Sequence, residues 1–358
     1  MMDRRIFIRL SSLGVVACAA GHSLTALAGS TADGYLMTVT GRLKLPEKGV
    51  FLPHEHVLTD FTGAEKIVQP QYNRTIAFKK MLPNLIAAKK AGVNVLTECT
   101  PAYIGRDVIL LKMLAEASGI AILTNTGYYA AAGLKYLPRH AYRESSLVLS
   151  ARWLKEWENG IEGTGIRPGF IKLGVDGGPL KEVEQKLIQA AAYTHLKSGL
   201  KIAIHNGNSS AVAAEIAILE KMGIDPKAMI WVHAQNASNS DVHMAMAKKG
   251  CWISLDGVSD EPASLEKYLA FIKVLKKESL LHRLLLSHDD GFAVENHGGE
   301  VTFKAYKDGN HQPYTSLMRT LKPALLKDVI SEEEYELITV KNPVQAFKIE
   351  VCRSFSSI

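Results

Sequence analysis

Two histidines separated by one residue, His54 and His56, end the apolar run Phe51-Leu52-Pro53. In a β-strand, successive side chains point to opposite faces, so these two imidazoles project to the same side. Two imidazoles on one face at the C-terminal end of a strand can bind one metal ion. An isolated pair of this kind is more often structural than functional. A metal site is therefore predicted only if further ligand residues occur elsewhere in the chain.

Four further residues of ligand type each end or closely follow another short apolar run, namely Lys172, His205, His233 and Asp289. If those runs are neighbouring parallel strands, their carboxyl ends meet at one end of the sheet or barrel. Core packing accounts for one or two such positions much more easily than for six. The sequence therefore predicts one metal site built from four imidazoles, one carboxylate and one lysine.

The residue types also indicate a chemistry. Neutral imidazole and carboxylate suit zinc, manganese, cobalt and iron alike, so the ligand set does not specify the metal. Lys172 is the unusual member, because an ammonium group cannot bind a cation. Its deprotonated amine could capture carbon dioxide, and the two oxygens of the resulting carbamate could bridge metals about 3.5–4 Å apart. A hydroxide between the metals would be the nucleophile, and Asp289 would take its proton when a carbonyl or phosphoryl centre is attacked.

The segments that must position these residues alternate between two kinds. Short runs rich in Val, Ile and Leu are typical of strands buried on both faces. Eight are predicted, at 50–54, 93–98, 120–124, 169–173, 201–205, 229–233, 251–256 and 283–287. Amphipathic helices are predicted at 75–91, 106–118, 146–159, 180–198, 209–222, 238–249 and 264–277, with Pro83 interrupting the first of them, and at 314–326 and 331–347.

Eight successive strand-then-helix units favour a (β/α)₈ TIM barrel, an α/β fold in which catalytic groups come from the C-terminal ends of the strands. A doubly wound open sheet is the alternative, but no Gly-rich phosphate turn follows the first strand. A short hairpin is expected at 35–49, before the barrel. The long stretch 291–313, which contains His297 and His311, is expected to be a loop that covers the mouth of the barrel.

The N-terminal residues are typical of an export signal. Asp3-Arg4-Arg5-Ile6-Phe7-Ile8 resembles a twin-arginine signal, an apolar stretch runs from Leu10 to Ala20, and Ala26-Leu27-Ala28 offers a cleavage site. We therefore expect residues 1–28 to be removed and residues 29–358 to form one periplasmic domain. Lipidation at Cys18 is the alternative, since Val15-Val16-Ala17-Cys18 resembles a lipobox.

Charge and cysteine content exclude several other classes. Without the signal, 39 basic residues stand against 35 acidic ones, and this mild excess of +4 gives no support for nucleic-acid binding. No membrane-spanning segment is expected, because polar residues interrupt the N-terminal apolar stretch. Cys99, Cys251 and Cys352 are widely spaced and odd in number, so they predict neither a disulfide framework nor a cysteine metal site.

Several of these motifs together resemble the phosphotriesterase-like branch of the amidohydrolase superfamily over about residues 36–350. The resemblance rests on Pro53-His54-Glu55-His56, Arg167-Pro168-Gly169-Phe170-Ile171-Lys172, Ile204-His205, Val232-His233, Leu255-Asp256, Leu286-Ser287-His288-Asp289 and Asn342-Pro343-Val344-Gln345-Ala346-Phe347.

The resemblance implies a centre with two divalent metal ions, for which zinc is the expected metal. His54, His56 and Asp289 would hold the buried ion, His205 and His233 would hold the more exposed one, and carboxylated Lys172 would bridge them. Asp289 and Lys172 are thus the predicted catalytic residues. Members of this branch hydrolyse phosphotriesters, lactones and other esters, and they are often dimers.

Tyr129 occupies a position where lactone-hydrolysing relatives often carry a tyrosine, and simple aromatic packing is the equal alternative for it. Asp256 is expected either to contact substrate or to orient a histidine, and Glu98 to accept an internal hydrogen bond. Gly257 stands where many relatives have a histidine or an arginine. Gln235-Asn236 follow Ala234 where phosphotriesterases carry an aspartate. Both departures remove ionisable groups and argue against efficient organophosphate hydrolysis.

The leading functional prediction is therefore a binuclear metal hydrolase that acts on a lactone or another carboxylic ester. A phosphoester hydrolase with the same centre is its nearest alternative. A Schiff-base lyase acting through Lys172 is a different class, since a desolvated amine condenses with carbonyls. A barrel that only binds a metal or another ligand is the non-enzymatic alternative.

Overall fold

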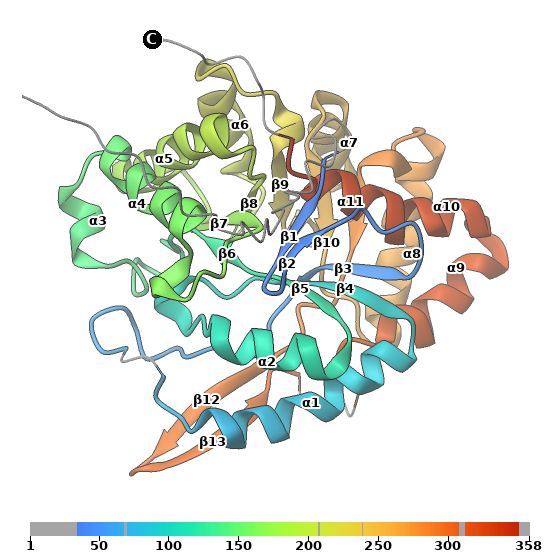
Figure 1. Cartoon of the computed structure of the whole chain (residues 1–358). Helices are drawn as coiled ribbons and strands as arrows, with labels where there is room; N and C mark the ends of the chain where they lie inside the picture. Colours follow the sequence, from blue (N-terminus) through green and yellow to red (C-terminus); the bar gives the residue numbers. More distant parts are fainter. Residues whose placement is uncertain (1–33, 68–69, 207, 238, 308–311, 351–358) are drawn as a thin grey trace, which may run out of the picture. The chain divides into compact units, whose positions relative to one another are not determined.

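Eight short parallel strands form a barrel whose helices lie outside it (Figure 1). The structure is a computed structural model of the chain and describes residues 34–67, 70–206, 208–237, 239–307 and 312–350. The predictions for residues 1–28, including the export signal and Cys18, lie outside these ranges. Within them, no helix is both long enough and apolar enough to cross a bilayer.

The barrel strands follow the predicted positions closely. Their bounds are β3 Val50–Glu55, β4 Val93–Glu98, β5 Ala121–Leu123 with β6 Asn125–Thr126, β7 Phe170–Val175, β8 Ile202–Asn206, β9 Met229–Val232, β10 Trp252–Leu255 and β11 Leu284–Leu286. The ladders run in parallel from β3 to β5 and from β6 to β11. Thr124 alone separates β5 from β6, so together they occupy the third barrel position. The (β/α)₈ prediction is confirmed.

Helices follow the strands and cover the barrel. They are α1 Arg74–Lys90, α2 Val108–Ser118, α3 Arg139–Arg143, α4 Ser146–Asn159, α5 Glu182–Ser198, α6 Val212–Lys221, α7 Ser240–Lys249, α8 Pro262–Lys277, α9 Lys322–Asp328, α10 Glu332–Glu336 and α11 Asn342–Phe347. Gly119 and Gly199 end α2 and α5 in the left-handed conformation that glycine adopts without steric cost. Pro83 lies within α1 and does not interrupt it, contrary to expectation.

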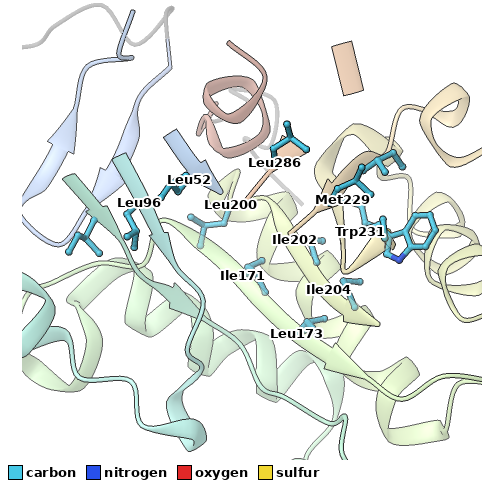
Figure 2. Packing of buried hydrophobic residues seen from close by; sticks show 14 of the residues in the cluster. Leu52, Leu96, Ile171, Leu173, Leu200, Ile202, Ile204, Met229, Trp231 and Leu286 are labelled. Atoms are coloured by element: carbon cyan, nitrogen blue, oxygen red, sulfur yellow. The ribbon is translucent and has the colours of Figure 1, made fainter. Parts of the chain in front are cut away.

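Alternation along the barrel strands separates two packed layers. Phe51, Phe170 and Ile230 belong to the cluster inside the barrel. Their neighbours Leu52 and Ile171 belong to the layer between strands and helices, part of which Figure 2 shows. A strand buried on both faces needs apolar residues at consecutive positions, which explains the unbroken Val, Ile and Leu runs. Most polar side chains of these strands therefore lie near the strand ends, whereas Lys172 lies inside β7.

The ends of the barrel carry additional elements. A hairpin of β1 Leu36–Thr38 and β2 Gly41–Leu43 precedes the first barrel strand, as predicted. The final helices include π-helical turns at Leu317–Leu321 and Leu337–Lys341.

The expectation of a loop at 291–313 was wrong over its first half. This stretch forms the antiparallel hairpin β12 Phe292–His297 and β13 Glu300–Ala305 (Figure 1). Its two strands are half-exposed, and the resulting mixture of polar and apolar residues looks like a loop in the sequence. Phe303 packs edge-on against the Tyr72 ring, with centroids 5.9 Å apart.

Candidate metal centre

A pocket of about 390 Å³ opens at the C-terminal ends of the barrel strands. Five of the six predicted ligands line it, namely His54, His56, His205, His233 and Asp289. They come from the ends of β3, β8, β9 and β11, strands that span more than 200 residues of sequence. The structure therefore brings together side chains that the sequence places far apart.

Asp289 lies close to His54, on β3, and to His56, directly after that strand. Its Oδ1 is 3.3 Å from Nε2 of His54 and 3.3 Å from Nε2 of His56. His54 is 1% exposed, whereas His56 and Asp289 are more open to the pocket. These three side chains form the first of two groups.

His205 and His233 form the second group. Their rings contact edge to face with centroids 4.4 Å apart, and the His233 ring lies 5.0 Å from that of His54. His233 has a left-handed backbone conformation, with φ of 60°, immediately after β9. The two groups are thus adjacent.

Lys172 lies on β7 below the pocket and is not part of its lining. The side chain is 1% exposed, and its Nζ has no hydrogen-bond partner. Burial lowers the pKa of this amine, which favours the neutral form. A buried amine that a substrate cannot reach from the pocket argues against the Schiff-base lyase.

Two of the histidines, His54 and His205, are also held in the neutral form. Burial, and then the charge of Lys172, lowers the pKa of His54 to about 4. Burial likewise holds the pKa of His205 well below its ordinary value, with further contributions from His233 and Lys172. Neutral imidazole is the form that binds metals.

These observations fit a divalent metal centre. Both ring nitrogens of His54 and the Nζ of Lys172 are buried and make no hydrogen bond with the protein. Buried polar atoms are normally satisfied, so such a cluster indicates a missing partner. His54, His233 and Asp289 each offer a ligand atom within 4.8 Å of the others. Imidazole and carboxylate are the donors that zinc, manganese, cobalt and iron accept.

Residues 34–347 match the model of the phosphotriesterase family. The chain belongs to this family. It is 26% identical over 303 residues to the phosphotriesterase homology protein of Escherichia coli, covering 84% of this chain and 98% of that protein. It is 26% identical over 360 residues to human N-acetyltaurine hydrolase, covering 88% and 98%.

The fold agrees with that membership. A solved structure described as organophosphate hydrolysis activity engineered from a weak promiscuous lactonase template superimposes with a TM-score of 0.77 and 25% identity, covering 87% of this chain and 99% of that one. Family membership and the ligand groups together support a metal-dependent hydrolase.

Hydrogen bonds that lead to buried carboxylates fix the tautomers of His56 and His233. Thr100 donates its hydroxyl hydrogen to Glu98 and so accepts from His56 Nδ1, at 2.8 Å. His233 Nδ1 donates to Asp256 at 2.6 Å. In both rings this leaves Nε2 free for a metal.

Asp256 is fully buried and does not line the pocket, which favours the orienting role over substrate contact. Burial raises its pKa, but His233 and His54 outweigh that effect and hold the pKa well below the ordinary value.

Gln235 and Gly257 are the neutral residues at the two positions where the family resemblance predicts ionisable groups. Both make hydrogen bonds in the structure. The side-chain amide of Gln235 donates to Asp256 at 2.9 Å and accepts from the Asp256 backbone at 3.1 Å. Gly257 donates its backbone N–H to the Tyr268 hydroxyl at 2.6 Å, and a Cβ at position 257 would lie 2.9 Å from that oxygen. A larger residue at 257 would therefore displace Tyr268.

The rest of the pocket wall is mostly aromatic. Tyr129, the one wall residue predicted from the sequence, lies with its ring 5.0 Å from that of His205. Sequence reasoning missed the other wall residues, which are Thr59, Phe61, Ile104, Ala132, Tyr136 and Tyr306. They lie in loops after strand ends, where no periodic pattern marks a residue as facing the pocket. Their position in loops that follow strands was the only feature of the sequence that could have indicated a place in the pocket wall.

Proposed function

We propose that this chain is a binuclear metal-dependent hydrolase that cleaves a lactone or another uncharged carboxylic ester. His54, His56 and Asp289 would hold one ion, His205 and His233 the other, and carboxylated Lys172 would bridge them. The observation that carries the proposal is the meeting of these residues around one pocket, with Lys172 buried below it and its amine unpartnered. Zinc is the expected metal.

The metals, when bound, supply an activated water at neutral pH and polarise the oxygen of the scissile group. The protein's own residues transfer the proton and orient the metal ligands. Asp289 is 32% exposed in the pocket, so its carboxylate can take a proton from the attacking water and pass it to the leaving group. Asp256 and the Thr100–Glu98 pair hold His233 and His56 in the orientation that presents Nε2.

The pocket wall supports an uncharged substrate. Phe61, Ile104, Tyr136 and Tyr306 offer apolar surface, and no lysine or arginine lines the pocket within the described residues. Away from the metal ions, a sulfonate or carboxylate group of a substrate would have no cationic side chain to bind there. This argues against an anionic amide such as N-acetyltaurine, which is the substrate in the names of several relatives. An apolar acyl or alkyl group fits better.

Paired assays on zinc-loaded protein test the proposal. We expect a panel of lactones with alkyl substituents to be hydrolysed faster than an aryl phosphotriester and faster than N-acetyltaurine. Phosphotriester turnover above that of every lactone would establish the alternative, which the family name itself supports. Full metal loading without hydrolysis of any of the three classes would reject both.

We also propose that the chain is exported and cleaved after Ala28, and that it acts in the periplasm. The twin arginines Arg4 and Arg5 support this. Replacing both by lysine should abolish export, and mass spectrometry of the exported wild type should find Gly29 as the first residue. A lipid-modified Cys18 at the N-terminus would instead establish the lipoprotein alternative.

A further inference from the structure

A second polar cluster lies behind the proposed metal ligands. Glu55, Ser287, His288 and Asp290 are at most 2% exposed, and none of them lines the pocket. In sequence they alternate with the ligands, since Glu55 lies between His54 and His56 and the other three flank Asp289. This cluster, the Glu55 cluster, has no role in the function proposed above.

The Glu55 cluster is held by hydrogen bonds and by an ion pair of Asp290 with Lys307 at 3.0 Å rather than by a metal ion, although three of its members lie close enough to bind one. Oε1 of Glu55 accepts from Ser287 Oγ at 2.7 Å, from His288 Nδ1 at 2.7 Å and from the His288 backbone N–H at 3.0 Å. His288 Nε2 accepts from the Leu317 N–H at 2.9 Å. Both nitrogens of His288 are therefore used, and no imidazole lone pair is left for a metal.

The two oxygens of Glu55 hold the backbone on either side of Asp289. Oε1 takes the N–H of His288, and Oε2 takes the N–H of Asp290 at 2.9 Å. Between them, Asp289 has a left-handed backbone with φ of 55°. That conformation costs most residues with a side chain about 1–2 kcal/mol, and aspartate adopts it more readily than most. The surrounding contacts therefore help to hold it.

The same segment closes the barrel. In the described chain β11 and β3 share no ladder pairs, and β11 ends at Leu286. The contacts across this seam include the bond from Asp289 N–H to His54 O, at 3.2 Å, and the bond from His54 N–H to Ser287 Oγ, at 3.1 Å. The Glu55 carboxylate adds its four bonds at the same place. Glu55 thus contacts the backbone on both sides of Asp289, although its side chain touches neither the pocket nor the Asp289 carboxylate.

We propose that Glu55 is a positioning residue that clamps the amides of His288 and Asp290, holds Asp289 in its left-handed conformation, and so sets the metal affinity of the centre. The inference rests on the proposed function to the extent that Asp289 is a metal ligand. It assigns Glu55 no contact with substrate.

Glu55→Gln is the direct test. Glutamine keeps one oxygen for the bonds that Oε1 accepts. Its NH₂ group replaces Oε2 and faces the Asp290 N–H, so two donors oppose each other where the wild type has a hydrogen bond. We expect zinc affinity, measured by chelator competition at fixed pH, to fall by about 10- to 100-fold, the range found for outer partners of metal ligands. Elemental analysis should show fewer than two metals per chain after dialysis.

Glu184→Gln is the matched control. Glu184 is 1% exposed and accepts the backbone N–H groups of Asp176 and Lys181, at 3.0 and 2.7 Å. It is thus a buried carboxylate clamp on the loop after β7; that loop carries no proposed ligand, and Lys172 lies four residues before it within the strand. Both variants should lose stability, whereas only Glu55→Gln should lose zinc affinity.

A pair of His288 variants decides the matter if Glu55→Gln does not fold. Asparagine places its amide nitrogen near the position of imidazole Nδ1 and can still donate to Glu55. Glutamine places its amide oxygen near Nε2 and cannot. We expect His288→Gln to bind zinc at least several-fold more weakly than His288→Asn.

The outcomes separate this inference from the proposed function. Wild-type zinc affinity in folded Glu55→Gln, an equal loss in Glu184→Gln, or equal affinities in the two His288 variants would each overturn the positioning role. Wild-type protein that binds no zinc would overturn the metal centre itself. Wild-type protein that binds two zinc ions and hydrolyses no ester would overturn only the proposed activity.

Discussion

At the scale of single residues, Lys172 combines features that rarely occur together. Its side chain is almost fully buried inside the barrel, its amine lacks a hydrogen-bond partner, and burial lowers the pKa of that amine. An unpaired ammonium ion in such a place costs several kcal/mol, so the neutral amine is favoured. A neutral amine is the form that can react with carbon dioxide and become an anionic ligand.

We therefore expect Lys172→Ala to retain fewer than two metals per chain and to lose at least about 100-fold in activity, the upper end of the loss found when even an outer partner of a ligand is removed. Short carboxylic acids should restore part of the activity by occupying the space of the carbamate. Metal analysis and assays with added acetate or propionate measure both effects. Exposed Lys44 supplies a control substitution. Full metal content in Lys172→Ala would contradict the bridge.

At the scale of elements, the chain that follows hairpin β12–β13 contributes Tyr306 to the pocket. Its ring lies 5.7 Å from that of His56 and 6.0 Å from that of Phe61, and its hydroxyl donates to Thr59 Oγ1 at 2.6 Å. The tyrosine thus joins the hairpin to the loop after β3 and forms one wall. Substrate selectivity should depend on this ring.

We expect Tyr306→Ala to raise KM for esters with a large apolar group by about 10-fold, because loss of one aromatic wall removes roughly 1.5 kcal/mol of apolar contact. KM for the smallest lactone should change little, and metal content should stay the same. Tyr306→Phe, which keeps the ring, is the control. A uniform rise in KM for all substrate sizes would count against a role in selectivity.

Helix α6 supplies a second element-scale prediction, because it packs a carboxyl group against the barrel. Glu215 is fully buried, and its Oε2 accepts from Asn206 Nδ2 of β8 at 3.3 Å while Oε1 has no partner. Burial raises the pKa of this carboxyl to about 8. The folded state therefore retains a proton that the unfolded chain releases near pH 4.5.

Because the folded pKa is raised, the stability that this group contributes is complete below about pH 4.5 and is lost as the pH rises to about 8. Glu215→Gln removes the titration. We expect the free energy of unfolding of the wild type, relative to that of the variant, to fall by about 2–4 kcal/mol across this interval. Denaturant unfolding of both proteins at pH 5, 6.5 and 8 measures it. Parallel pH curves for the two would show that Glu215 is not titrating.

At the scale of the whole molecule, the proposed ligands join strands from both ends of the barrel sequence. His54 lies near its beginning and Asp289 near its end. Metal ions that bind between them would bind the folded state but not the unfolded chain, in which these ligands are far apart. Metal binding should therefore stabilise the entire domain rather than one loop.

We expect removal of metal by a chelator to lower the free energy of unfolding by about 3 kcal/mol relative to protein in metal at 100 times the dissociation constant. Calorimetry of the apo and loaded forms measures the shift in Tm. In Lys172→Ala the shift should be much smaller. Identical transitions for apo and loaded wild type would contradict a centre that links the barrel's two ends.

The sequence alone determined the barrel and the identity of the residues that meet in it. Strands buried on both faces require unbroken apolar runs, and parallel strands of one barrel present their carboxyl ends together, so ligands at those ends could be predicted to converge. The hairpin β12–β13 was missed because its half-exposed strands have a mixed composition. The wall residues Phe61, Tyr136 and Tyr306 were missed because loops have no period.

Only the tertiary structure decided the direction in which the His54 side chain points and the contacts that Glu55 makes around Asp289. Phe51 points into the barrel and Leu52 points out, so strict alternation would turn His54 outward. An irregularity in the pairing of β3 with β4 between Leu52 and Glu55 changes that phase and places His54 in the pocket. The clamp of Glu55 on the chain around Asp289 joins residues more than 230 positions apart. Such pairings depend on long-range packing, which no local pattern of residues specifies.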